Sequence, residues 1–421
     1  DAGGIIGACY NSAVVTENAN TAESLSATTF AAGIVGNYQT TETPAAAEPA
    51  SNKLTFDFEG NTSSTAINSI TAQNKDLLIY TNGNVVNGEI RYTLAEFNAL
   101  TSIPAAAEKV YVDLGNAPLQ NGLTIGNDKI ADHYYYGEPN STTAPEGFPH
   151  DTGRTDNDNR HIYSTGKDTV TVVVTGSVTG ASDTGDFNAG AITLKVPDAA
   201  NVIFDTVTFG EGQMAMSMWT ENGVQSMTVP HRLASVTFNG CTFKGNWLQN
   251  GAFGADKMTI TGCTFEKYEN TAAPHSDGFD CKNNSNPIWI QNMGQTNVTI
   301  EGCTINAVRP IKLWENDVSG TAVIKDNVFD MSKCSIDNDS THKNIAVMFS
   351  TINWSLGNVE ISGNTVKGDA TALVCFGDAS KVKMAEGATF KISNNKLADG
   401  VKALVKWKTS TEITDFSIVT E

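Results

Sequence analysis

The chain has 421 residues, of which 17 % are charged and 8 % aromatic, and this composition with 37 glycines is typical of a β-rich exported protein. Its formal net charge of −19 argues against nucleic acid as a partner, because phosphate binding requires clustered Lys and Arg. No apolar stretch of about 18 residues occurs, so we expect no membrane span and a secreted or cell-surface protein.

The first 85 residues carry a weak repeat and are interpreted as a separate β-rich segment. The stretches GGIIGACYNS (3–12) and AAGIVGNYQT (31–40) resemble one another at a spacing of 29 residues. Their apolar residues and glycines predict short coils of a repeat structure. We therefore divide the chain into a segment over residues 1–85 and a main domain over residues 86–421. We expect both to be part of a longer, multidomain protein.

A helical pattern lies near the start of the main domain. In TLAEFNALTSI (93–103) apolar residues recur at helical spacing, and Thr93 followed by Glu96 is the sequence signature of a capping box. The pattern predicts a short amphipathic helix over 93–103, which we expect to cap an open end of the β structure. Its apolar face consists of Leu94, Phe97 and Leu100.

Four apolar stretches and one long polar excursion follow the helix. The excursion, 131–165, is polar and rich in aromatic residues, and we expect a long functional loop there, with Tyr134 and Tyr135 as ligand-binding side chains. The four stretches are predicted strands, at 109–114, 122–127, 169–176 and 191–197.

From residue 200 onward one short phrase recurs. Apolar and polar residues alternate on both sides of a central pair such as Gly-Cys or Asp-Asn, which indicates two half-buried strands joined at a bend. Successive phrases are 22 to 40 residues apart, as in a solenoid whose loops differ in length. The central apolar residues of the phrases are Phe204, Phe238, Ile260, Ile300, Ile324, Ile361 and Ile392.

The second residue of each bend predicts a ladder through the stack. Stacked strands lie about 4.8 Å apart, so residues at this position contact their counterparts above and below. We expect buried thiols in the middle of the ladder and hydrogen-bonded Asn side chains towards its C-terminal end. The seven cysteines include no CxxC pair, so neither a zinc knuckle nor a thioredoxin-type site is indicated. The ladder positions are Val207, Cys241, Cys263, Cys303, Asn327, Asn364 and Asn395.

A third apolar stretch follows each bend. Three strands in a fixed order predict an all-β fold, a right-handed parallel β-helix with three strands per coil. The third stretches are 277–282, 309–314, 345–349, 371–376 and 402–407. In the last three of them the predicted inward residues are Ile345, Val347 and Phe349, then Ala372, Val374 and Phe376, then Ala403, Val405 and Trp407.

One polar cluster is predicted where 277–282 would stack on 309–314. If Phe279 and Cys281 face inward over Ile311 and Leu313, charged side chains alternate with them on the outer face. A flat aromatic ring among charged hydrogen-bonding groups is suited to sugar binding. The candidate catalytic residues are Asp277, Asp280, Arg309 and Lys312, and the candidate ligand-binding residues, besides the two tyrosines, are His275, Lys282, Trp247 and Trp314.

This segment resembles the pectate lyases, which are right-handed β-helix enzymes. DGFD (277–280), VTIEGC (298–303) and RPIKLWEN (309–316) stand where that family has DGLID, VTISNN and a Lys-containing apolar strand. The resemblance implies Ca²⁺ as the candidate cofactor, bound by Asp277 and Asp280, with Lys312 at a basic position. The family's motif on the preceding coil is missing, since LQNGAFGAD (248–256) stands there, and so is its catalytic arginine motif on the following coil.

Two functions remain open. The first is a non-catalytic adhesin, stalk or glycan-binding module, whose partner is a carbohydrate or a host or cell-surface protein. The second is a polysaccharide lyase or hydrolase that acts on acidic glycans through the outer face near 275–314. The missing motifs and the negative charge favour the first. Stacked coils have open ends, so end-to-end self-association is a further expectation.

Overall fold

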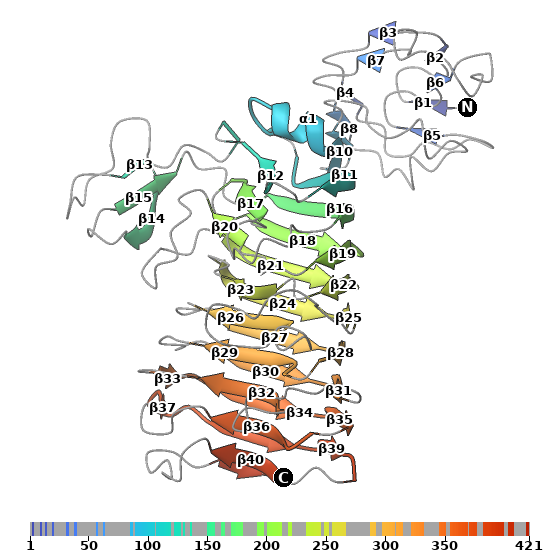
Figure 1. Cartoon of the computed structure of the whole chain (residues 1–421). Helices are drawn as coiled ribbons and strands as arrows, with labels where there is room; N and C mark the ends of the chain where they lie inside the picture. The colour runs from blue at the N-terminus through green and yellow to red at the C-terminus, as the bar shows by residue number, and fades with distance from the viewer. Residues whose placement is uncertain are drawn as a thin grey trace. The chain divides into compact units, whose positions relative to one another are not determined.

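The structure is a computed structural model in which the secondary structure of the described residues is almost entirely β-strand (Figure 1). It divides into two compact units, residues 1–113 with 169–173, and residues 114–168 with 174–421. The described residues are 89–105, 107–118, 122–127, 129–130, 170–179, 192–197, 200–212, 218–220, 233–245, 248–251, 255–266, 287–291, 297–307, 309–314, 321–331, 345–350, 354–368, 370–376, 382–399, 403–407 and 418–420, with the short strands before residue 87 and between 135 and 164 that are named below.

Short strands at the start of the first unit pair in parallel. β1 (Ala2–Gly3) pairs with β5 (Ala31–Ala32), and β2 (Cys9–Tyr10) pairs with β6 (Tyr38–Gln39). Both pairs join residues 29 positions apart, so the spacing of the predicted repeat is confirmed in the backbone. The remaining short strands are β3 (Ala13–Val14), which pairs with β7 (Phe56–Asp57), and β4 (Ala19–Asn20), β8 (Thr62–Ser63) and β9 (Val85–Val86), which pair in that order.

The predicted helix is present as α1 (Leu94–Ala99), between β10 (Glu89–Thr93) and β11 (Lys109–Pro118). The backbone N–H of Glu96 donates to Thr93 Oγ1 at 3.2 Å, and the N–H of Thr93 donates to Glu96 Oε2 at 2.8 Å, so the capping box is confirmed. Phe97 is buried, with its ring 6.3 Å from that of Tyr92. The helix ends before residue 103 because Leu100 is extended, and the Thr-Ser pair after it favours a turn.

The first half-strands of the repeat phrases form one parallel ladder in the second unit. The central apolar residues predicted for the phrases pair with one another in register, from Phe204 to Ile392, and all are buried. The ladder contains β18 (Asn201–Asp205), β21 (Leu233–Asn239), β24 (Ala255–Thr261), β27 (Asn297–Glu301), β30 (Ala322–Lys325), β34 (Val359–Ser362), β38 (Phe390–Ser393) and β41 (Ile418–Thr420).

The second half-strands form another parallel ladder beside the first. It contains β16 (Thr171–Thr179), β19 (Thr208–Gly212), β22 (Thr242–Gly245), β25 (Thr264–Phe265), β28 (Thr304–Asn306), β31 (Val328–Met331), β35 (Thr365–Gly368) and β39 (Lys396–Leu397). One partly exposed row runs in register through Ser177, Thr208, Thr242, Thr264, Thr304, Val328, Thr365 and Lys396.

The third stretches form a 6-stranded parallel sheet. Four of the five predicted strands are confirmed, and their predicted inward residues pair in register, for example Phe349 with Phe376 and Phe376 with Trp407. The predicted strand 277–282 lies outside the described residues. The sheet contains β23 (Leu248–Gly251), β26 (Ile288–Gln291), β29 (Ile311–Trp314), β32 (Ile345–Ser350), β36 (Ala372–Phe376) and β40 (Ala403–Trp407).

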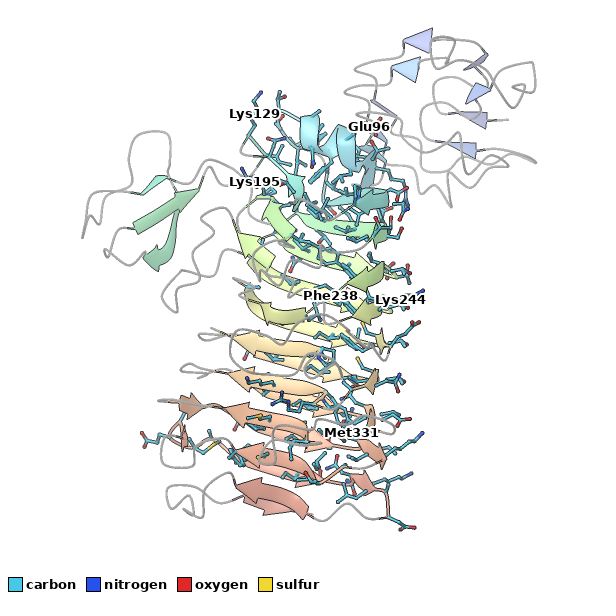
Figure 2. All side chains as sticks on the ribbon, viewed as in Figure 1. Glu96, Lys129, Lys195, Phe238, Lys244 and Met331 are labelled. Atoms are coloured by element: carbon cyan, nitrogen blue, oxygen red, sulfur yellow. The ribbon has the colours of Figure 1, made fainter. Side chains whose placement is uncertain are left out.

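Aromatic rings stack through the core of the second unit. The Phe209 and Phe243 rings lie 4.6 Å apart with a 1° interplanar angle, and Phe265 continues the stack at 4.5 Å. Figure 2 shows Phe238 inside the stack of strands and Lys244 pointing away from it. The alternation of apolar and polar residues therefore does place one side of each strand in the core.

Every bend between the two half-strands has the same backbone. Its first residue adopts positive φ, between 53° and 67°, which glycine and asparagine tolerate better than other residues. In the bends from Thr206 to Gly363, the N–H of this residue donates to a carbonyl oxygen of the next strand, as Gly262 does to Glu301 at 3.0 Å. The positive-φ residues are Thr206, Gly240, Gly262, Gly302, Asp326, Gly363 and Asn394.

The predicted ladder at the second bend residue is confirmed. Asn327 Nδ2 donates to Asn364 Oδ1 at 3.0 Å, and Asn364 Nδ2 donates to Asn395 Oδ1 at 2.9 Å. Each of these amides also donates to a backbone carbonyl, and Asn327 Oδ1 accepts the N–H of Cys303 at 2.9 Å. Cys241, Cys263 and Cys303 are buried and reduced, as expected.

Smaller sheets accompany the ladders. Within 131–165, which was predicted as a loop, β13 (Tyr135–Tyr136), β15 (His161–Ser164) and β14 (His150–Thr155) form an antiparallel sheet in that order. Two further sheets are parallel: β12 (Leu123–Gly126) with β17 (Ile192–Lys195) and β20 (Met218–Thr220), and β33 (Trp354–Leu356) with β37 (Val382–Met384).

The protein is therefore all-β, with long parallel sheets and very little helix, a fold compatible with the predicted parallel β-helix. The described part of the chain contains no helix long and apolar enough to cross a membrane.

Candidate functional site

The two basic residues of the candidate site, Arg309 and Lys312, lie at β29, in the middle of the 6-stranded sheet. The flanking residues Ile311 and Leu313 are buried in the core, at 0 % and 1 % exposure, as expected. Because side chains alternate along a strand, Lys312 belongs to the opposite, outer face of the sheet. Arg309 precedes the strand by two residues, separated from it by Pro310.

The neighbour of β29 is not the predicted one. We expected 277–282 to stack on 309–314, but β26 occupies that side, with Ile288 opposite Ile311 and Ile290 opposite Leu313. The expected stacking is therefore wrong. Two isoleucines over Ile311 and Leu313 continue the apolar row of the core, and this explains why 288–291 takes the position.

The backbone register gives Lys312 one neighbouring residue on each adjacent strand. Trp289 lies opposite it on β26, and Met348 lies opposite it on β32. On the next strand Met348 is followed by Cys375, which is fully buried. The row of the lysine thus continues through two sulfur-containing residues, Met348 and Cys375.

The outer face is covered where β29, β32 and β36 pass. Lys312 is 5 % exposed and Arg309 is 1 % exposed, while Met348 and Cys375 are buried. We expected the two cations to face solvent, and this expectation is wrong. Long-range packing over the sheet decides their burial, and a strand's own alternation says nothing of what lies over its outer face.

The acidic half of the predicted site is not described. Asp277, Asp280, His275, Lys282, Trp247 and Tyr134 lie outside the described residues, as do the side chains of Trp314 and Tyr135. The backbone of Trp314 ends β29, whereas Tyr135 is in β13 and so belongs to a different sheet. The catalytic, ligand-binding and Ca²⁺ roles of these residues stay predictions.

Among the described residues, no group of three or more His, Cys, Asp or Glu side chains could hold a metal ion. In the ladder, the electrostatics of Cys263 and Cys303 oppose nucleophilic chemistry. The hydrogen bond with the Cys241 thiol, and burial, raise the pKa of Cys263 to about 12. The pKa of Cys303 is also raised, first by its hydrogen bond with Cys263 and then by burial. Cys263 and Cys303 therefore stay protonated in the folded protein at neutral pH.

The sequence analysis missed Trp289 as a neighbour of Lys312. The signal was present in PIWIQ (287–291), where Ile288 and Ile290 alternate with Trp289 and Gln291. This stretch is short and lies outside the recurring phrase, so it was not recognised as a strand.

No protein-family model, curated protein or solved structure matches the chain. The function is therefore argued from the described residues.

Proposed function

We propose that the chain is a non-catalytic stalk of a secreted or cell-surface protein. The observation that carries this proposal is the unbroken register of the first ladder, in which each strand from β18 to β38 stacks on the next with its apolar row in line. A stack of this kind forms a stiff element, because each strand is hydrogen-bonded on both sides. A stiff element holds whatever is attached to it at a fixed distance.

We further propose a right-handed β-helix with three strands per coil. In support, pairing partners recur in steps of three along the chain: β24 pairs with β27, β25 with β28 and β26 with β29. The right hand is the one that parallel crossover connections adopt. If the coil has this form, the chain shares its architecture with the pectate lyases.

The non-catalytic part of the proposal is supported by the burial of Lys312 and Arg309. A basic group that binds an acidic polymer must reach it, and these two side chains are covered. The net charge of −19 also repels an acidic polysaccharide at long range. The stalk could also be adhesive. In that form of the proposal it is a glycan-binding module whose partner is a neutral carbohydrate or a cell-surface protein.

The stalk is tested by single-molecule force spectroscopy. The whole chain is placed between two marker domains of known unfolding force and stretched. We expect it to keep its length as the load rises and then to lengthen in discrete steps, because forced unfolding depends on the unfolding rate of packed units. Gradual extension from the lowest loads, as for an unstructured linker, would contradict the proposal.

The enzyme alternative is tested on a panel of uronate polymers, with and without Ca²⁺. A stalk yields no product that absorbs as an unsaturated uronate. Formation of such a product, abolished by Asp280→Asn, would instead establish a lyase.

The location is tested by antibody labelling of intact cells, and labelling only after lysis would contradict a surface role.

A further inference from the structure

Three cysteines occupy the same position in successive coils. Asn239 and Thr242 pair with Thr261 and Thr264, so Cys241 lies directly over Cys263. The next pairs of strands place Cys263 over Cys303 in the same way. Each of the three thiols is 1 % exposed. Their Sγ–H groups donate to the carbonyl oxygens of Phe204, Phe238 and Ile260 at 3.2, 3.4 and 3.5 Å.

While the strands of the ladder are paired, which we call the closed ladder, the Cβ atoms of neighbouring cysteines are slightly too far apart for a disulfide. Side chains stacked in register point the same way, so their Cβ atoms are separated by about the 4.8 Å that separates the strands. A disulfide accepts Cα atoms at this distance but requires Cβ atoms about 3.5–4.5 Å apart. The bond can therefore form only when two coils shift relative to one another.

The closed ladder also protects the thiols from reagents. Thiol–disulfide exchange requires a thiolate that a solvent disulfide can reach. Burial keeps the solvent disulfide away from all three thiols, and the raised pKa of Cys263 and of Cys303 leaves these two without the thiolate that exchange requires. When the strands separate at the bend, which we call opening of the corner, the hydrogen bonds from the thiols to the three carbonyl oxygens break. The thiols then become accessible and can ionise.

We propose that Cys241, Cys263 and Cys303 form a redox latch: two of these thiols are oxidised to a disulfide only after neighbouring coils separate at the bend, and the disulfide then keeps the coils from pairing again. When the corner opens, a thiolate of the ladder attacks a low-molecular-weight disulfide, forms a mixed disulfide with it and releases one small thiolate. The neighbouring ladder thiolate then attacks the protein sulfur of the mixed disulfide and releases the second small thiolate. Two protein thiols are oxidised to one disulfide, and the small disulfide is reduced to two thiols.

The latch acts in one direction. A bond between Cys241 and Cys263 draws their Cβ atoms closer than the strand spacing and removes both Sγ–H donors from the carbonyls that accept them. The corner therefore does not close again in register until the bond is reduced. Cys263 is the essential member, because Cys241 and Cys303 are two strand spacings apart, about 9.6 Å.

The experiment exposes the full chain to oxidised glutathione, first without urea and then in urea below the unfolding midpoint. Disulfides are identified by peptide mass mapping after the free thiols are blocked. Without urea we expect the ladder thiols to react at least 100-fold more slowly than in the fully unfolded chain. In partial urea we expect a 241–263 or 263–303 disulfide, and a native signal that returns after urea removal only once reductant is added.

Two variants serve as controls. Cys263→Val should leave mixed disulfides at Cys241 and Cys303 but no bond between them. Cys375→Val, in the strand β36 outside the ladder, should leave the ladder disulfides unchanged. Equal reaction rates with and without urea, or only mixed disulfides in the wild-type chain in partial urea, would overturn the proposal. The wild-type mapping decides even if a variant fails to fold, and none of these results depends on the stalk function.

Discussion

The Asn364 side chain makes four hydrogen bonds in the ladder. Its Oδ1 accepts from the N–H of Asn327 and from Asn327 Nδ2, both at 3.0 Å, and its Nδ2 donates to Ile324 O and Asn395 Oδ1, both at 2.9 Å. The side chain is fully buried. Its removal would leave buried donors and an acceptor without partners, which is the costly way to lose a hydrogen bond.

We therefore expect Asn364→Ala to lower the free energy of unfolding by roughly 3 kcal/mol. The matched control is Asn239→Ala, which removes one exposed hydrogen bond to Asp205 Oδ1 and should change stability by about 0.5 kcal/mol. Urea unfolding followed by circular dichroism measures both. Equal effects of the two substitutions would show that the ladder contributes no more than a surface contact.

The thiol at Cys263 makes stability depend on pH. In the unfolded chain it loses its proton near its ordinary pKa of 9.0, but in the folded protein it keeps the proton until about pH 12. The folded state therefore binds more protons between these two values, and the free energy of unfolding falls as pH rises through that window, by up to about 1.4 kcal/mol per pH unit. Below pH 9.0 this contribution is fully present.

Cys263→Val removes this contribution. We expect the difference in unfolding free energy between wild type and variant to be constant below pH 9.0 and to shift in favour of the variant above it. Urea titrations on both sides of that pH provide the measurement. A difference that does not change with pH would mean that the thiol ionises equally in both states.

At this scale the ladder could be predicted and the candidate site could not. The ladder residues follow a bend whose Gly, Asp or Asn marks it in the sequence, so Cys303 and Asn327 were correctly aligned although the surrounding phrases differ. The burial of Lys312 depends on what packs over the sheet from elsewhere in the chain, and no local pattern encodes that.

At the scale of elements, the bends define where each strand begins and ends. Gly302 has φ of +65°, and a Cβ there would meet only the Gly262 nitrogen, at 3.9 Å. Gly363 has φ of +67°, and a Cβ there would collide with the side chain of Asp326 on the neighbouring bend. The two glycines share a backbone conformation but differ in the space around them.

This difference gives a paired prediction. Gly302→Ala should lower the unfolding free energy by about 1–2 kcal/mol, because only the left-handed backbone is strained. Gly363→Ala should lower it further, because the side chain of Asp326 must also move. Combining Gly363→Ala with Asp326→Gly should remove the additional loss, as a double-mutant cycle measured by thermal or urea unfolding would show. Additive effects would contradict the collision.

The elements themselves were predictable to different degrees. Strands on both sides of a bend carry period-2 alternation and a turn signal, and their registers agreed with the prediction. The helix was identified from its capping box, although Leu100 ends it early. The strand β26 was missed because its four residues carry alternation but no repeat phrase, and 277–282, which has a more conspicuous sequence, was assigned its place.

At the scale of the second unit, the account makes one central claim: successive phrases stack at a constant rise along the row from Ser177 to Lys396. Thr208 and Thr365 are separated by five strand spacings in this row, which gives about 24 Å. Ser177 and Lys396 are separated by seven, which gives about 34 Å. Loops of unequal length between the phrases do not enter these distances.

Double electron–electron resonance between spin labels at these two pairs tests the claim most directly. The labels are attached to cysteines introduced at both sites, with Cys9, Cys281 and Cys334 replaced by serine. We predict two narrow distance distributions whose centres differ by about 10 Å, since both pairs share the same label geometry. Broad distributions, equal centres, or separations beyond about 60 Å, as for a flexible chain of this length, would contradict the stacked fold.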